Sequence, residues 1–304
     1  MIALPGFQDA NFKVLEKAFS VRLLLKANQI KIEGQSDEAI EKAENVLDAL
    51  VQEIDHHGFV ELDEVERLCG LASKGHNAAE DFYDEKPIVR TRTGKVIVPK
   101  TKHQKELVQA FQNSKITFAS GVAGTGKTYL AVAFAVSELK KEKISKIILT
   151  RPAVEAGESL GFLPGDMQEK VDPYLRPLYD ALNEMLGQEN VEKYREKGII
   201  EIAPLAFMRG RTLNDAVVIL DEAQNATKAQ MKMFLTRMGK NCRMMVNGDI
   251  SQIDLIRKND SGLIQACTIL QGIEGIAIQY LDQSDVVRNP LVQKIIERYE
   301  QVDS

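Results

Sequence analysis

The sequence has few residues of the kinds that form disulfides or bind transition metals. Its three cysteines are odd in number and widely separated, which fits neither a disulfide framework nor a zinc site. They are Cys69, Cys242 and Cys267. The four histidines lack cysteine or carboxylate companions at metal-ligand spacing. We therefore expect a reduced, cytoplasmic protein without a transition-metal centre.

Long hydrophobic runs are also absent. The longest strongly apolar run, residues 130–136, is far shorter than the ~20 residues that cross a bilayer, so we expect no membrane partner. The first residues lack a basic region followed by an apolar stretch, so no secretory signal is expected. Hydrophobic residues make up 44% and charged residues 27%, which excludes disordered and fibrous classes. A length of 304 residues favours one large domain plus a smaller one.

The net charge of −5 argues against a nucleic-acid coat, but the charges are unevenly distributed. Residues 33–66 contain twelve carboxylates and a single basic residue, Lys42. Residues 86–106 contain seven lysines and arginines and one carboxylate, Glu106. This basic segment fits either a contact with a polyanion or a solvated connector, and the sequence leaves both open.

Apolar periodicity predicts a small α+β domain at residues 1–72, a basic connector at 73–100 and a larger core at 101–304. In the small domain we expect helices at 9–18, 37–54 and 62–72 and strands at 21–26 and 29–33. In the core we expect strands at 116–119, 147–150, 199–202, 217–220, 244–246 and 276–280, and helices at 127–141, 166–186, 228–238 and 261–269. Strands that are apolar throughout and alternate with helices indicate a parallel sheet covered on both faces. The predicted fold class is therefore α/β, with a doubly wound, mostly parallel sheet.

The strongest motif is a glycine-rich loop between the first core strand and a helix. It has the P-loop spacing, and a chance match in a chain of this length has a probability of roughly 1%. Its residues are Gly121, Val122, Ala123, Gly124, Thr125, Gly126, Lys127 and Thr128. Backbone N–H groups and the helix N-terminus would hold phosphates. Lys127 would reach the β- and γ-phosphates of a nucleotide, and Thr128 would bind Mg²⁺.

A second motif places two carboxylates at the end of the buried strand 217–220. Carboxyl ends of parallel strands form the ligand crevice of a doubly wound sheet. Asp221 is therefore predicted to hold Mg²⁺, and Glu222 to act as the general base on the attacking water. Alone, this pattern is weak because helix caps resemble it, but its position after a P-loop favours the functional interpretation.

A third motif follows the strand 244–246. Asn247, Asp249 or Gln252 could sense the γ-phosphate or orient water. The alternative is a turn in which Asn and Gly simply close the strand.

Other features discriminate among P-loop proteins. A guanine-specific protein would carry Asn-Lys-x-Asp after a strand, and residues 258–260 have neither that order nor that setting. A Ras-like switch would read Asp-x-x-Gly, whereas Asp221 is followed by Glu222, an alanine and Gln224. These differences favour an ATPase, with an adenine nucleotide and water as substrates.

The assembled motifs resemble those of the PhoH family of bacterial ATPases. The resemblance covers roughly residues 95–300 and rests on the segments 98–104, 121–128, 150–158, 160–166, 220–225, 234–239, 248–254, 261–263 and 285–288. It implies a RecA-like ATPase core related to superfamily 1 helicases. The first ~60 residues are similar to a KH-like half-domain but lack the Gly-x-x-Gly loop that clamps nucleotides, so we do not expect that part to bind RNA directly.

The resemblance also implies roles for particular residues. Gln104 would contact the adenine edge, Gln252 would read the γ-phosphate, and Arg288 would approach the phosphates as an arginine finger. Arg151 and Arg237 are alternatives for that finger, and Arg288 could instead be a surface arginine that caps the final helix. Family members usually have proline at position 122 and histidine at position 289, where this chain has valine and asparagine. Neither departure removes a phosphate or metal ligand.

The resemblance further implies that ATP hydrolysis with Mg²⁺ is coupled to RNA metabolism or ribosome maturation, with RNA or a ribosome-associated protein as partner. Only one RecA-like core is expected, so the second wall of the nucleotide site would come from another subunit or a partner. A homo-oligomer is therefore expected. The alternative function is a nucleotide-gated module that binds a protein partner, in which hydrolysis is incidental.

Overall fold

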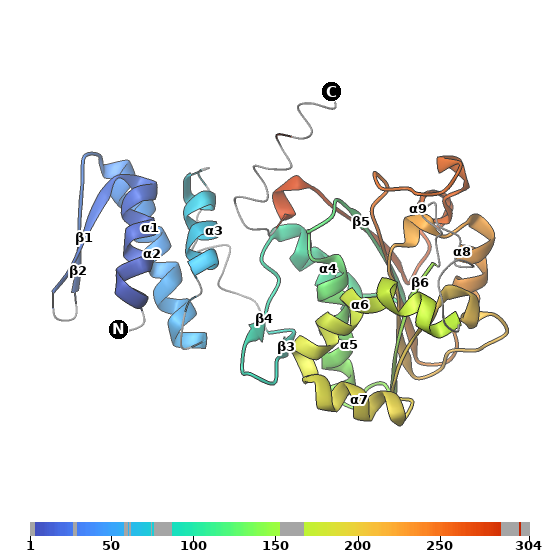
Figure 1. The fold of residues 1–304 in the computed structure, drawn as a ribbon. Coiled ribbons are helices and arrows are strands. Elements are labelled where there is room, and N and C mark those ends of the chain that lie inside the picture. Colours follow the sequence, from blue (N-terminus) through green and yellow to red (C-terminus); the bar gives the residue numbers. More distant parts are fainter. Residues whose placement is uncertain are drawn as a thin grey trace. The chain divides into compact units, whose positions relative to one another are not determined.

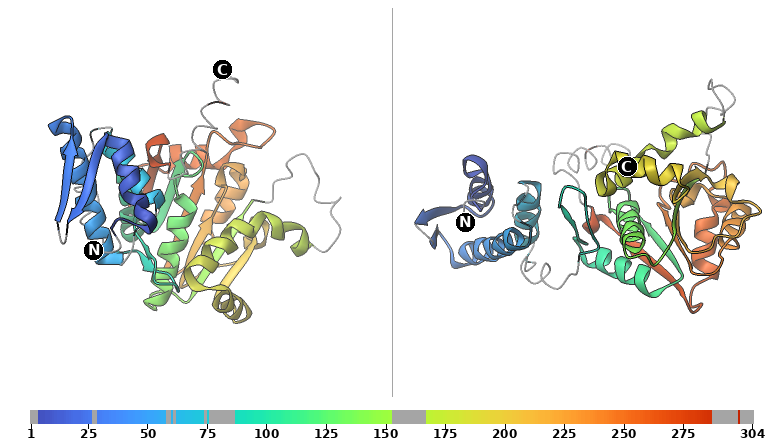
Figure 2. Two further views of the ribbon diagram at one scale, coloured as in Figure 1. Left: turned by 60° about the vertical axis from the view of Figure 1, so that its left-hand side comes forward. Right: turned by 90° about the horizontal axis from the view of Figure 1, so that it is seen from below.

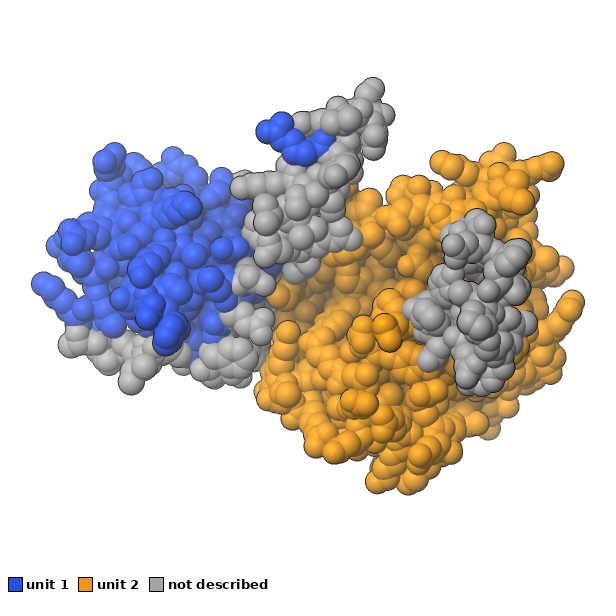
Figure 3. Space-filling model, viewed as in Figure 1, with its two compact units in different colours: residues 1–86, 289–304 blue, residues 87–288 orange. Residues whose placement is uncertain are grey.

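The computed structural model describes residues 4–26, 29–57, 60, 62–73, 75, 87–152, 167–286 and 298. The chain divides into two compact units, residues 1–86 with 289–304 and residues 87–288, which Figure 3 distinguishes by colour. Residues 87–100, which the sequence assigns to a connector, therefore belong to the second unit. Among the described helices, none is both long and apolar enough to span a membrane.

The first unit is a small α+β assembly. Its elements are α1 (Ala10–Phe19), β1 (Val21–Lys26), β2 (Gln29–Gly34), α2 (Asp37–His57) and α3 (Leu62–Ser73). The two strands pair antiparallel beside the helices, as Figure 2 shows. Helix α2 buries Val46 and Leu50 completely, because its apolar residues recur at helical spacing on one face. The helices and strands predicted for this part are confirmed.

The second unit is built on a six-stranded sheet in the order β10-β5-β9-β8-β6-β7. Its strands are β5 (Ile116–Gly121), β6 (Lys146–Arg151), β7 (Ile200–Pro204), β8 (Ala216–Leu220), β9 (Cys242–Gly248) and β10 (Ile276–Leu281). Every neighbouring pair is parallel. The six carboxyl ends therefore lie along one edge, where a doubly wound sheet binds its ligands.

Helices cover both faces of this sheet (Figure 1). One face packs against α4 (Lys102–Asn113), α5 (Lys127–Lys140), α6 (Met167–Leu186) and α7 (Gln188–Glu196), and the other against α8 (Lys228–Leu235) and α9 (Gly262–Ile269). Side chains alternate between the faces: Val217 and Ile219 join the α5 side, and Val218 and Leu220 the α8 side. The predicted α/β, doubly wound class is confirmed.

One hairpin and two helices of the second unit were not predicted. The hairpin of β3 (Val89–Arg90) and β4 (Val96–Ile97) has strands too short for a visible alternation, yet it buries Val89 and Ile97 in the α5-side core. Helices α4 and α7 lie in strongly polar sequence. In α4 the Thr101 side chain caps the first turn, and apolar residues on one face, including Phe111, reach the core.

The environment of the cysteines leads to a prediction about thiol reactivity. All three are free and buried, and burial raises the pKa of Cys69 to about 12 and those of Cys242 and Cys267 to about 11. Because the thiolate is the reactive form, we expect negligible labelling of the native protein by a disulfide reagent at pH 8. In denaturant all three thiols should react. Rapid labelling of the native protein would contradict this burial.

Candidate nucleotide site

The loop after β5 has the backbone shape of a phosphate cradle. Gly124 (φ 85°) and Gly126 (φ 80°) adopt left-handed conformations that residues with a Cβ rarely accept. These turns bring the chain from the carboxyl end of β5 to the first turn of α5, which begins at Lys127. The site therefore combines loop N–H groups with the positive end of a helix, the usual setting for a bound phosphate.

Lys127 is held inside this loop. Its side-chain amine donates to the carbonyl oxygens of Gly121 (2.6 Å) and Val122 (2.8 Å) and to Thr125 Oγ1 (3.1 Å), and the residue is 8% exposed. A cation in this position adds positive charge to that of the loop and the helix terminus. The structure thus brings together the residues that the sequence assigned to the cradle.

Asp221 follows β8 and meets the cradle directly. It is 3% exposed, and its Oδ1 accepts a hydrogen bond from Thr128 Oγ1. Its Oδ2 accepts from Arg151 Nε at 2.8 Å. The two residues predicted to bind Mg²⁺ therefore lie in contact, and a hydroxyl with a carboxylate is a donor set that suits this ion. The ion pair with Arg151 was not predicted, because the two residues are far apart in sequence.

Glu222 occupies an unusual backbone position. Its φ of 52° and ψ of 38° are left-handed, which costs a non-glycine residue about 1–3 kcal/mol and occurs often at active sites. Gln224 Nε2 donates to its Oε2 at 2.7 Å, and its side chain remains 45% exposed. The carboxylate is thus oriented by a neighbour and accessible to water, as a general base requires.

A cavity of about 490 Å³ opens beside these groups. Its lining includes the cradle residues Gly124, Lys127 and Thr128 together with Asp221, Glu222 and Gln252. Gln252 is exposed and lies on the loop after β9, as the third motif predicted. Asp180 and Glu184 of α6 also line the cavity. The sequence did not identify these two because they lie on an ordinary amphipathic helix.

Several buried polar atoms at this edge have no hydrogen-bond partner among the described residues. They are Thr150 Oγ1, both amide atoms of Asn247, and Asp249 Oδ2. Leaving such a group unpaired costs about 1–3 kcal/mol, so native proteins keep few of them. By strand alternation Asn247 lies on the α5 face of the sheet, with the cradle, and Thr150 on the α8 face, whereas Asp249 follows the end of β9 and lines the cavity. Buried polar atoms without hydrogen-bond partners on the cradle side are consistent with the binding of a polar ligand there.

Gln104 lies against the cradle. Its Nε2 donates to the carbonyl of Thr125 at 3.0 Å, and its Oε1 accepts from the N–H of Lys100 at 2.6 Å. It is 3% exposed. In this structure the side chain holds the loop backbone, and its contact with adenine stays a prediction.

One cluster of possible metal ligands, His103, Asp282 and Asp285, occurs in the described part of the chain. Asp285 is buried and accepts from Thr101 Oγ1 (2.5 Å) and from the backbone N–H of Asp282 (2.9 Å). Its Oδ2 lies 2.8 Å from His103 Nδ1, and this hydrogen bond raises the pKa of His103. These bonds join α4 to the turn after β10 and explain the cluster without a metal.

The predicted arginine finger cannot be placed. Arg288 lies outside the described residues. Arg237, one of the two alternative candidates for the finger, donates to the carbonyls of Met233 (3.1 Å) and Arg211 (3.2 Å). It therefore secures the end of α8. Arg151, the other alternative, pairs with Asp221 inside the site.

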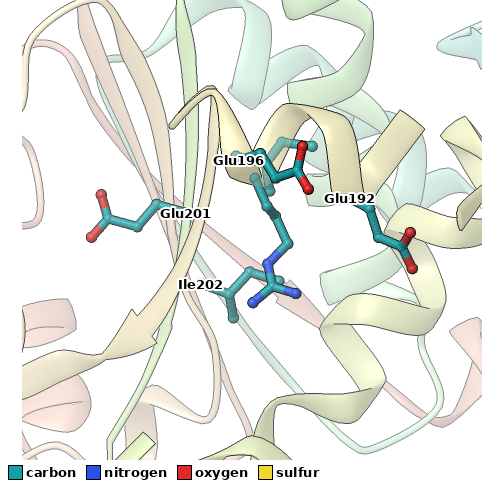
Figure 4. A pocket seen from close by; sticks show the side chains of 6 residues that line it. Glu192, Glu196, Glu201 and Ile202 are labelled. Atoms are coloured by element: carbon teal, nitrogen blue, oxygen red, sulfur yellow. The ribbon is translucent and has the colours of Figure 1, made fainter. Parts of the chain in front are cut away.

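A second hollow, of about 510 Å³, lies beside α7 and β7 (Figure 4). Figure 4 shows Glu201 and Ile202 pointing to opposite sides of β7. Glu201 pairs with Arg211 at 2.5 Å, and Arg195 stacks over the Tyr179 ring at 4.8 Å. The charged side chains of Glu201 and Arg195 thus already have partners, and no residue of the phosphate cradle lines this hollow.

Residues 96–300 match the family described as PhoH-like protein. The chain belongs to the PhoH family. It is 52% identical over 301 residues to a PhoH-like protein of Bacillus subtilis, covering 98% of this chain and 93% of that protein. It is 44% identical over 303 residues to one of Synechocystis, covering 100% and 92%. A solved Sulfolobus solfataricus SWI2/SNF2 ATPase core in complex with dsDNA is 13% identical with a TM-score of 0.38, covering 65% of this chain and 47% of that one, a likeness too weak to argue from.

Family membership and the cradle together make this chain a nucleotide-binding protein of the ATPase type. The family was correctly recognised from the sequence, on the segments that run from the basic stretch to residue 288.

The position of Lys127 predicts the effect of removing its charge. Lys127→Ala should weaken nucleotide binding about 10- to 100-fold, since a charge-assisted hydrogen bond contributes about 1.5–3 kcal/mol. Titration calorimetry with ATP measures the change. Lys140→Ala is the matched control, because that lysine lies on the same helix and donates to the Arg90 carbonyl. Equal affinity of the Lys127→Ala and control variants would exclude this loop as the phosphate site.

Proposed function

We propose that this protein hydrolyses ATP with Mg²⁺ at the cavity beside Lys127, and that hydrolysis is coupled to RNA. One observation carries the ATPase part: the cradle, Asp221 and Glu222 line a single cavity at the carboxyl edge of the sheet. The RNA part is supported by the family resemblance and by the basic segment described below.

The residues fit a bound Mg²⁺. Thr128 Oγ1 and an Asp221 carboxylate oxygen already lie in contact. Asp249 lines the same cavity, and its buried Oδ2 has no hydrogen-bond partner among the described residues. Thr128 and Asp221 would hold the ion. When bound there, Mg²⁺ would neutralise charge on the β- and γ-phosphates.

The chain's own residues would supply the rest of the chemistry. The loop N–H groups and Lys127 would bind the phosphates and orient the terminal one. Glu222 would accept a proton from the attacking water, and Gln224 would keep the Glu222 carboxylate in place through its 2.7 Å hydrogen bond. Arg151, which contacts Asp221 and lies 3.8 Å from Glu222, would place a positive charge beside both carboxylates.

The basic segment is compatible with an RNA contact. Arg92 pairs with Glu189 at 3.2 Å, and Lys95 with Glu184 at 3.4 Å. All four side chains are more than 40% exposed, so each pair contributes only about 0–1 kcal/mol. A polyanion could therefore replace these partners at little cost. The same weak, exposed pairs are also expected on a solvated surface.

Substituting the two carboxylates separately tests the division of roles. Glu222→Gln should keep ATP affinity but reduce kcat by ~10²–10⁴, because the amide keeps the shape and cannot accept the proton. Asp221→Asn should instead weaken Mg²⁺-dependent ATP binding. Equilibrium binding and phosphate release separate the two effects. Glu192→Gln on α7 serves as the control and should behave as wild type. Identical binding behaviour of the Glu222 and Asp221 variants would refute the assignment.

Salt dependence tests the RNA proposal. Replacing Arg90, Arg92 and Lys95 with Gln should weaken binding of single-stranded RNA and flatten the slope of log affinity against log salt by about 0.7 per lost phosphate contact. The control replaces three exposed lysines of the same unit, Lys228, Lys232 and Lys240, and should leave the slope unchanged. ATP turnover, measured with and without RNA, should rise several-fold when RNA is present. If the substitutions leave the salt slope unchanged and RNA leaves the rate of ATP turnover unchanged, the basic segment is a solvated surface. That result would favour a nucleotide-gated module that binds a protein partner.

A further inference from the structure

Both carboxylate oxygens of Asp221 are held by side chains of the protein. Oδ1 accepts a hydrogen bond from Thr128 Oγ1. Oδ2 accepts two hydrogen bonds from the Arg151 guanidinium, one through Nε at 2.8 Å and one through Nη2. Asp221 is 3% exposed, and the side chain of Arg151 is 16% exposed. Solvent and salt therefore screen this ion pair much less than a pair on the surface.

The sheet itself places Arg151 beside Asp221. Arg151 ends β6, which lies next to β8, and in register Thr150 of β6 pairs with Leu220 of β8. Arg151 and Asp221 are the next residues on their strands, so they are neighbours at the carboxyl edge. The N–H of Asp221 also donates to the carbonyl of Thr150 at 2.9 Å. The guanidinium thus reaches the carboxylate independently of any ligand.

The charges around the cavity favour a nucleotide that brings its own cation. Of the described residues that line it, two are cationic, Lys127 and Arg151. Lys127 donates to the carbonyls of the loop, whereas Arg151 pairs with a carboxylate. Five lining residues are acidic: Asp180, Glu184, Asp221, Glu222 and Asp249. Triphosphate without a metal would meet an excess of negative charge there, which disfavours its binding.

A divalent cation and the guanidinium would compete for Asp221. Like charges on one buried carboxylate repel each other strongly. Proteins usually bind Mg²⁺ through one or two carboxylates together with substrate phosphates, and seldom through protein ligands alone. Thr128 and Asp221 by themselves therefore offer the ion too little to displace Arg151. Glu222 Oε1 lies 3.8 Å from the guanidinium and is a second carboxylate to which Arg151 can turn.

We propose that Arg151 is the counter-ion that reserves the metal-binding carboxylate, so that Mg²⁺ binds Asp221 together with ATP and not by itself. This inference rests on the proposed ATPase function. Arg151 neutralises the buried charge of Asp221 and gives it up, in favour of Glu222, when phosphate oxygens complete the metal's ligands. It is a positioning residue, because it acts through Asp221. By linkage, ATP and the metal then raise each other's affinity.

Substituting Arg151 tests this inference in the absence of nucleotide. Arg151→Gln leaves the Asp221 charge without this counter-ion, so its melting temperature in EDTA should fall by about 5–10 °C. Mg²⁺ alone should then raise that melting temperature. Mn²⁺, followed by its EPR signal, should bind the variant about 5- to 100-fold more tightly than the wild type. The wild type should show no rise in melting temperature with Mg²⁺ alone.

Two further variants separate this role from a purely structural one. Arg151→Lys keeps the charge but forms fewer hydrogen bonds, so its response to Mn²⁺ should lie between those of the wild type and Arg151→Gln. It also serves as the test if the glutamine variant does not fold. The matched control is Arg211→Gln. Arg211 pairs with Glu201 at 2.5 and 2.7 Å, and neither residue lines the cavity. The control should melt at a lower temperature and gain no response to Mg²⁺ or Mn²⁺.

Two results would overturn the inference. One is Mn²⁺ binding that is no tighter in the Arg151 variants than in the wild type or in Arg211→Gln. The other is a wild-type protein whose melting temperature rises with Mg²⁺ alone as much as that of Arg151→Gln. Failure of the wild type to bind ATP would instead refute the proposed function, and it is scored separately because the metal comparison contains no nucleotide.

Discussion

The site depends on one buried carboxylate. Asp221 is almost inaccessible, and a charge in that position is tolerated only when it is paired and hydrogen-bonded. Its partners are Thr128 at the start of α5 and Arg151 at the end of β6. The carboxylate thereby joins the cradle helix, β6 and β8 at one point. Because both partners are side chains from other elements, the ends of those elements must meet for Asp221 to be buried.

Around this point the structure combines satisfied and unsatisfied polar groups. Gln224 uses both ends of its amide, on Glu222 and on the backbone of Asp249, and so fixes the accessible carboxylate. Asn247, on the strand next to β5, has no hydrogen-bond partner for either amide atom within the described residues. The Gln224 hydrogen bonds hold Glu222 and the residue after β9 together, and Asn247 leaves bonding capacity on the face where the cradle lies. A site that combines fixed hydrogen bonds with unmet ones suits a polar ligand.

Local patterns predicted much of this arrangement. The apolar strands were enough to predict the fold class. Together with the P-loop spacing, they also predicted that Lys127, Thr128 and Asp221 lie at one site. Contacts between distant segments could not be predicted from local patterns, because they depend on tertiary packing. Examples are the ion pair of Arg151 with Asp221 and the hydrogen bond from Gln104 to the cradle backbone. Short or polar elements such as β3 and α7 carry too few apolar residues to show a period. The position of Asn247 inside β9 and its burial were likewise not predicted, because the sequence suggested that the strand ends at residue 246.

The most direct test of the account measures nucleotide binding and turnover in one sample of the wild-type protein. ATP is titrated by calorimetry with and without Mg²⁺, and phosphate release is followed at each addition. The account predicts one ATP per chain and phosphate release that requires Mg²⁺ and saturates together with binding. Failure of ATP to bind, or phosphate release that persists at an equal rate without Mg²⁺, would contradict it.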